Sequence, residues 1–150
     1  MRKTRPSLAS QRGVALIETA ITLPLLLLVA VGIFEFGRAF EVWQVMTNAA
    51  REGARVAVLP NPATGAVEER VRQYLEIGAL ENLDSVSVSV QRDVNITIGA
   101  TTATASQVTV TYPFSFMVLQ PVANLVVSGS TLGAPITLTT SAVMRNETQF

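Results

Sequence analysis

Gly13 and Glu18 are the residues whose types and spacing could support chemistry. Both lie at the start of an apolar run, and Glu18 is the only charge between Val14 and Phe34. A charge within an apolar span is costly and usually marks a function or a partner. A peptidase that cut after Gly13 would leave a cationic α-amino group on Val14, and Glu18 of a neighbouring copy could pair with it inside the apolar layer. Alternatively, Glu18 lies at the headgroup level and reaches water.

Other kinds of chemistry find little support in the sequence. The chain has no histidine and no cysteine, which removes the commonest general base, the usual zinc ligands and the thiol nucleophile. Ser85, Ser87 and Ser89 fall on the outward side of an expected strand, and no base is available to activate them. The acids do not show the spacing of a calcium loop. We therefore expect no enzymatic activity, no catalytic residue, no metal site and no cofactor.

The charges are unevenly distributed along the chain, although the formal net charge is zero. The first 13 residues hold four basic residues and no acid, and the remainder holds seven arginines against eleven acids, a formal charge of −4. A chain of that sign does not attract phosphate backbones. We expect no nucleic-acid partner, and no pattern predicts a small-molecule substrate. The four basic residues are Arg2, Lys3, Arg5 and Arg12.

These basic residues precede a segment that predicts a membrane span. Residues 14–34 are apolar apart from Glu18, and a helix of about 20 residues crosses the hydrocarbon core of a bilayer. Basic residues before the span, against mixed charges after it, predict a cytoplasmic N-terminus. We therefore expect a basic cytoplasmic leader over residues 1–13, a single pass over 14–34, and an extracytoplasmic remainder.

Three interpretations of this N-terminal segment remain open on the residues alone. It could be an uncleaved signal anchor. It could be a secretory signal peptide cut near the small residues Ala30 and Gly32, although the helical pattern continues beyond them without a breaker. It could also be a leader that is trimmed after Gly13, with Glu18 at the fifth position of the shortened chain.

The third interpretation is supported by a resemblance to a known family. The stretch RGVALIE resembles the type IV prepilin peptidase motif, and GVALIETAITLPLLLLVAVGIFEFGRAF followed by NAAREGARVAV resembles the TadE-like family. The resemblance covers residues 12–58, and more weakly the closing stretch 136–147. Thr19 follows Glu18, where the major pilins of Flp type tend to carry tyrosine, so the resemblance favours a minor subunit.

The resemblance carries implications for fold, location and partners. It implies a minor pilin or pseudopilin of a tight-adherence, Flp-type pilus that serves adhesion, which is either retained in the bacterial inner membrane or built into the fibre. A prepilin peptidase would cut between Gly13 and Val14, where a residue without a side chain is required. Glu18 would then pair with the Val14 amine of another subunit. The partners would be the peptidase, other pilin subunits, the assembly platform and the lipid bilayer.

The helical pattern continues past the span as an amphipathic segment over residues 35–59. Pro24 should kink the helix inside the span. Beyond it we expect a polar stripe that starts at Glu35, opposite an apolar face of Phe36, Phe40, Trp43, Met46 and several alanines. Small residues allow close approach of backbones, either onto the protein's own sheet or between subunits. Those expected to pack closely are Ala50, Gly53, Ala54 and Ala57.

Residues 60–150 predict an α+β domain of the pilin-like kind, with a short helix on an antiparallel sheet of about three or four strands. Pro60 and Pro62 end the long helix, and a second helix is expected from 62 or 64 to 77. Alternating apolar residues predict strands over 86–90, 94–98, 108–114 and from 136 onward. Residues 116–134 could form a short helix, a lid on the sheet or a membrane-surface contact. A permanently anchored, extracytoplasmic binding module remains the alternative function.

Overall fold

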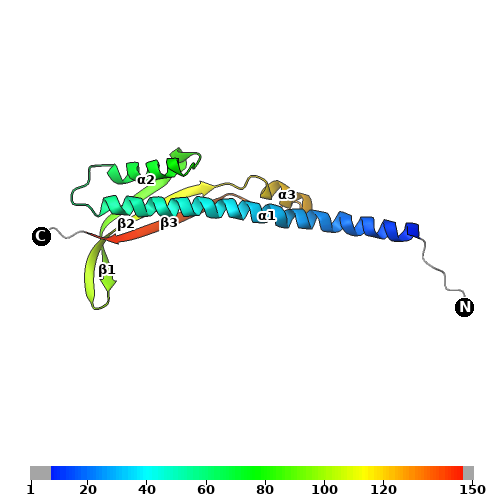
Figure 1. The fold of residues 1–150 in the computed structure, drawn as a ribbon, viewed down its shortest axis with the longest axis horizontal. Coiled ribbons are helices and arrows are strands. Elements are labelled where there is room, and N and C mark those ends of the chain that lie inside the picture. Colours follow the sequence, from blue (N-terminus) through cyan, green and yellow to red (C-terminus); the bar gives the residue numbers. More distant parts are fainter. Residues whose placement is uncertain (1–7, 147–150) are drawn as a thin grey trace, which may run out of the picture. The chain divides into compact units, whose positions relative to one another are not determined.

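The structure, a computed structural model, describes residues 8–146 in an α+β fold, which confirms the predicted class (Figure 1). Most of the predicted leader, including Arg2, Lys3 and Arg5, lies outside the described residues, as does Glu147 at the other end. The elements follow in the order α1 (Leu8–Ala57), α2 (Ala66–Ile77), a 3₁₀ turn (Leu83–Ser85), β1 (Ser87–Ile98), β2 (Thr101–Phe114), α3 (Leu119–Val126) and β3 (Ile136–Arg145).

The first helix, α1, is a single element of 50 residues that runs through Pro24. Proline removes one backbone hydrogen bond from a helix, here the bond to the carbonyl of Ala20, and membrane helices tolerate this loss. Two positions before the proline, Oγ1 of Thr22 donates to the carbonyl of Glu18 at 2.9 Å. The helix ends at Ala57, close to the predicted end at 59, because Pro60 cannot continue the pattern.

The second helix, α2, begins later than the sequence pattern predicts. Gly65 precedes it with a φ of 79°, a left-handed conformation that delays the start until Ala66. Val67, Val71 and Leu75 form its buried face, at the spacing that an amphipathic helix requires. It ends at Gly78, as predicted.

The three strands form one antiparallel sheet in the order β1-β2-β3. Residues 86–90 and 94–98 were expected as separate strands, but they belong to the single strand β1, which contains a bulge between Gln91 and Val94. Asp93 adopts a φ of 58° in this bulge, which re-establishes the alternation of faces after the irregularity. Pro113 lies near the end of β2, where only β3 pairs with it, in agreement with the predicted strand end.

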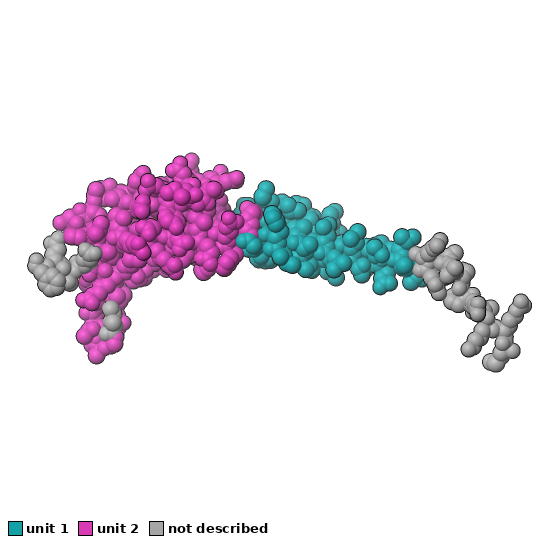
Figure 2. Space-filling model, in the orientation of Figure 1, with its two compact units in different colours: residues 1–37, 115–134 teal, residues 38–114, 135–150 magenta. Residues whose placement is uncertain are grey.

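The described chain divides into two compact units, shown in different colours in Figure 2. The larger unit comprises residues 38–114 together with the chain from 135 onward, and the other comprises the chain up to 37 together with 115–134. In the larger unit, the second half of α1 packs on the sheet: Oγ1 of Thr47 lies 3.1 Å from Oγ1 of Thr140 on β3. The core consists of Met46 and alanines from α1, the apolar face of α2, and Val108, Val110 and Phe114 from β2.

Candidate membrane and assembly helix

The first half of α1 exposes a long series of apolar side chains. The helix is long and apolar enough to span a membrane, and it is the one such helix within residues 8–146. The side chains of Leu16, Ile17 and Ile21 are mostly exposed. An apolar surface of this extent marks contact with lipid or with other proteins. One N-terminal helix that could cross a bilayer is therefore present, as predicted.

The predicted trimming and pairing residues lie on the first turns of this helix that have described side chains. Gly13 has open space around it, and Val14 and Glu18 are exposed. Val14 and Glu18 are four positions apart, so they lie on the same face of the helix, one turn from each other. The geometry thus places Val14 and the carboxyl group of Glu18 on one accessible face, where another molecule can reach both.

The strip of small residues near the end of α1 is covered by the same chain. Ala50 and Ala54 are fully buried, and Ala57 nearly so. A Cβ atom on Gly53 would lie 2.5 Å from Cγ2 of Val71 on α2 and 3.2 Å from Cγ1 of Val108 on β2. Of the two partners considered for this strip, the structure shows the intramolecular one: α2 and the sheet.

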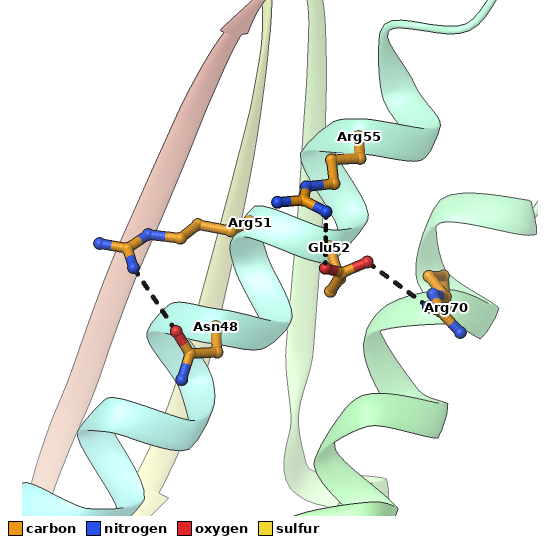
Figure 3. A network of polar contacts seen from close by, with 5 residues as sticks. All are labelled: Asn48, Arg51, Glu52, Arg55 and Arg70. Atoms are coloured by element: carbon orange, nitrogen blue, oxygen red, sulfur yellow. Dashed lines mark hydrogen bonds and ion pairs between the residues drawn. The ribbon is translucent and has the colours of Figure 1, made fainter.

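A network of exposed polar side chains joins α1 to α2 across this contact (Figure 3). Glu52 makes ion pairs with Arg55 on its own helix and with Arg70 on α2, each at 3.4 Å. Glu52 and Arg55 are three positions apart on α1, a spacing that allows a pair across one helical turn. Nη1 of Arg51 donates to Oδ1 of Asn48 at 3.5 Å. Exposed ion pairs of this kind contribute about 0–1 kcal/mol each to the free energy of unfolding, so the network adds little to the packing of α1 on α2.

The apolar face predicted for residues 36–57 is covered only in part by the chain itself. Met46 and the alanines are buried, but Phe36, Phe40 and Trp43 are exposed. Phe40 and Trp43 lie side by side, with ring centroids 6.0 Å apart. The helical spacing predicts the face but not what covers it, so the exposed rings leave that prediction standing.

Glu35 was predicted as the start of a solvated polar stripe, and the structure overturns that expectation. Its side chain is 0% exposed. The backbone N–H groups of Met117 and Val118 donate to its Oε1 at 2.7 and 2.6 Å. These groups lie at the N-terminus of α3, where Val118 provides no side-chain cap of its own. A carboxyl group on α1 therefore supplies the cap that α3 lacks.

Nothing in the local sequence pattern reveals this partnership, since the two segments are more than 80 positions apart. The nearest signal is the position of Glu35, a single acid directly after the apolar span. Among the described residues, no cluster of acids, cysteines or histidines could hold a metal ion. Glu35 therefore acts in the described part of the chain as a structural cap.

Comparison with known families gives one result. Residues 13–55 match the family model of the TadE-like proteins. The resemblance drawn from the sequence is thereby confirmed for this segment, and the match indicates a protein related to the Tad pilus, with partners from that pilus system. No curated protein and no solved structure gives a significant match to the chain.

The TadE-like segment coincides with α1 from Gly13 to Arg55. It therefore includes Gly13, the predicted trimming position, and the whole apolar span with Glu18 and Pro24. It also includes Glu35 and most of the small-residue strip. The sheet and α3 lie outside it.

Proposed function

We propose that this chain is a minor pilin or pseudopilin that a prepilin peptidase trims after Gly13 and that takes part in assembly of a Tad, Flp-type adhesion pilus. The observation that carries the proposal is the TadE-like match, which begins at Gly13 and continues over the exposed apolar helix. The shared face of Val14 and Glu18 supports it, since both groups are accessible on the same helix surface.

In this proposal the chain crosses the bacterial inner membrane once, with its N-terminus in the cytoplasm and its sheet outside. The orientation follows from the basic residues ahead of the span. The new amine of Val14 pairs with Glu18 of a neighbouring pilin subunit, since neither charge is stable alone in the apolar layer. Such a pair sets the axial register between packed helices. The chain itself carries out no reaction and is the substrate of the peptidase.

Substitution of Gly13 by leucine tests the proposal. In cells that contain the prepilin peptidase, the wild-type chain should yield a product whose mass corresponds to an N-terminus at Val14. The Gly13→Leu chain should keep its leader, because the added side chain obstructs the cut. Gly37→Leu is the matched control, since Gly37 is another α1 glycine with open space around it, and this variant should be trimmed normally.

Intact-mass measurement and N-terminal sequencing distinguish the alternatives. A wild-type chain that retains Met1 in these cells would contradict trimming and favour the permanently anchored binding module. A Gly13→Leu chain of the same shortened mass as wild type would show that Gly13 does not define the cut.

A further inference from the structure

The connection between β2 and β3 is a closed, uncharged loop that contains α3. None of residues 115–134 is charged. The ends of the loop are held together, because Phe114 pairs with Ile136 in the sheet register. Within it, Gly133 approaches the start of α3 so closely that a Cβ atom there would lie 2.6 Å from the backbone nitrogen of Gln120. The loop is thus a defined structure of its own.

This loop packs beside the last turns of the apolar span. Glu35 binds the N-terminus of α3, and the rings of Phe36 and Phe116 meet edge to face with centroids 5.8 Å apart. Figure 1 shows α3 alongside α1, and α3 belongs to the same compact unit as the part of α1 up to Gly37. One face of α3 is buried, and α1 is partly covered along one helical face that leads to Glu35. The covered residues are Leu119, Val122 and Ala123 on α3, and Leu28 and Val31 on α1.

The position of Glu35 fixes the depth of the loop in a bilayer. A helix over residues 14–34 is about 31 Å long at 1.5 Å per residue, which matches the hydrocarbon thickness of roughly 30 Å. Glu35 therefore lies at the far boundary of the hydrocarbon. The partly covered residues of α1, Leu28 and Val31, fall on the hydrocarbon side of that boundary, and the part of the loop beside them lies at the same depth.

The outer face of the loop is uncharged and carries several large apolar side chains, interspersed with the exposed polar residues Gln120, Asn124, Ser128 and Thr131. Leu125 is 80% exposed and Met117 is 70% exposed, and Val126, Val127 and Leu132 add to the same kind of surface. Apolar side chains exposed at hydrocarbon depth are stable in contact with lipid, whereas in water they would form an unusual exposed patch.

The backbone of the loop also suits a medium that is poor in water, where every N–H group needs an internal acceptor. Glu35 accepts from the N–H groups of Met117 and Val118. Within the helix, the N–H groups of Val122 and Val127 donate to carbonyls one turn earlier, at 3.1 and 2.9 Å. After the helix, the N–H of Ala134 donates to the Thr131 carbonyl at 3.0 Å.

We propose that residues 116–132 are embedded in the extracytoplasmic leaflet, where the exposed face of α3 contacts lipid acyl chains. The loop then gives the chain a second membrane contact beside its span, and Glu35 joins the two by capping α3. This inference rests on the membrane insertion that is part of the proposed function. The occupant is the bilayer because the apolar surface of the loop continues that of the span.

The chain has no cysteine, so single cysteines can carry a fluorescent label without background. The full chain is reconstituted in phosphatidylethanolamine–phosphatidylglycerol vesicles with a label at Leu125→Cys. Two controls carry the same label: Leu25→Cys, a 56% exposed position in the span, and Ile77→Cys, a 77% exposed apolar position on α2 in the other unit. Quenching is measured with nitroxide on the lipid acyl chains and, separately, with aqueous iodide.

The label at position 125 should be quenched by the lipid nitroxide severalfold more strongly than the label at position 77, and should resist iodide as the label at position 25 does. If the label at position 125 is quenched in the same way as the label at position 77, while the lipid nitroxide quenches the label at position 25, the proposal is overturned and membrane insertion is left intact. Protection from both quenchers would also overturn it, because a second copy or another protein would then cover α3. Absence of lipid quenching at position 25 would overturn both the insertion and the lipid contact.

Discussion

At the scale of single residues, Glu35 and Glu18 show how the same side chain takes different roles along one helix. Glu18 is exposed, four positions after Val14, and accessible to another molecule. Glu35 is buried, and two backbone N–H groups of the same chain donate to it. A carboxyl group is retained in an apolar helix only where it has a partner. For Glu35 the structure supplies that partner, whereas for Glu18 we propose that a neighbouring subunit does.

Replacement of Glu35 by alanine should loosen the start of α3. Two partly buried N–H groups would lose their acceptor, and a fully buried unsatisfied group costs about 1–3 kcal/mol, so the loss here should be at or below the lower end of that range for each group. Amide hydrogen exchange at Met117 and Val118 should therefore become faster in the full chain in detergent. Glu41→Ala is the matched control, because Glu41 is an exposed acid on the same helix, and it should leave both amides unchanged. Equal protection in Glu35→Ala and wild type would show that the cap does not stabilise α3.

At the scale of elements, the larger unit depends on how closely α1 approaches α2 and β2. The residues of α1 at this contact are small, and larger side chains there would increase the distance between α1 and α2. Gly53 is the closest point, with Val71 and Val108 around the space where a side chain would extend. The polar network of Glu52 lies at the exposed margin of the same contact.

The variant Gly53→Ala should destabilise the larger unit. Alanine is favoured over glycine in a helix by about 1 kcal/mol, but overpacking of a filled core costs about 1–3 kcal/mol, and the valine methyl group at 2.5 Å has to move. We expect a lower urea midpoint for the full chain in detergent, followed by near-UV circular dichroism. Gly37→Ala has open space and should raise the midpoint or leave it unchanged. A midpoint for Gly53→Ala at or above that of wild type would contradict the close packing.

At the scale of the whole molecule, the charge of the chain depends on whether the leader is present. The leader holds four basic residues and no acid, while the rest carries a formal charge of −4. Removal of the leader, as proposed, would therefore convert a neutral chain into an acidic one.

This change predicts the isoelectric point of the trimmed protein. Wild-type protein from cells with the prepilin peptidase should focus at a more acidic pH than the intact chain, whose sequence gives about 6.3, because four positive side chains are lost. Gly13→Leu from the same cells should focus with the intact chain. Identical focusing positions for wild type and Gly13→Leu would show that the leader remains in both. Isoelectric focusing in urea and a nonionic detergent makes the measurement.

The sequence by itself determined the features that depend on local period and composition. An apolar run of about 20 residues predicts a span whatever the rest of the chain does, and α1 follows it without a break. The alternation of valine with serine and threonine predicted the antiparallel strands, and the combination of Gly13, Glu18 and the following helix identified the TadE-like segment that the family model matches.

Only the tertiary structure decided the features that depend on contacts between distant segments. The two strand patterns around Arg92 and Asp93 became one strand, because pairing with β2 continues across the bulge. The small residues of α1 acquired α2 and β2 as their neighbours, which helical spacing alone leaves open. Glu35 changed from a polar-stripe residue to a buried cap because its partners, Met117 and Val118, come from a loop more than 80 positions away in the sequence, which no local pattern connects to it.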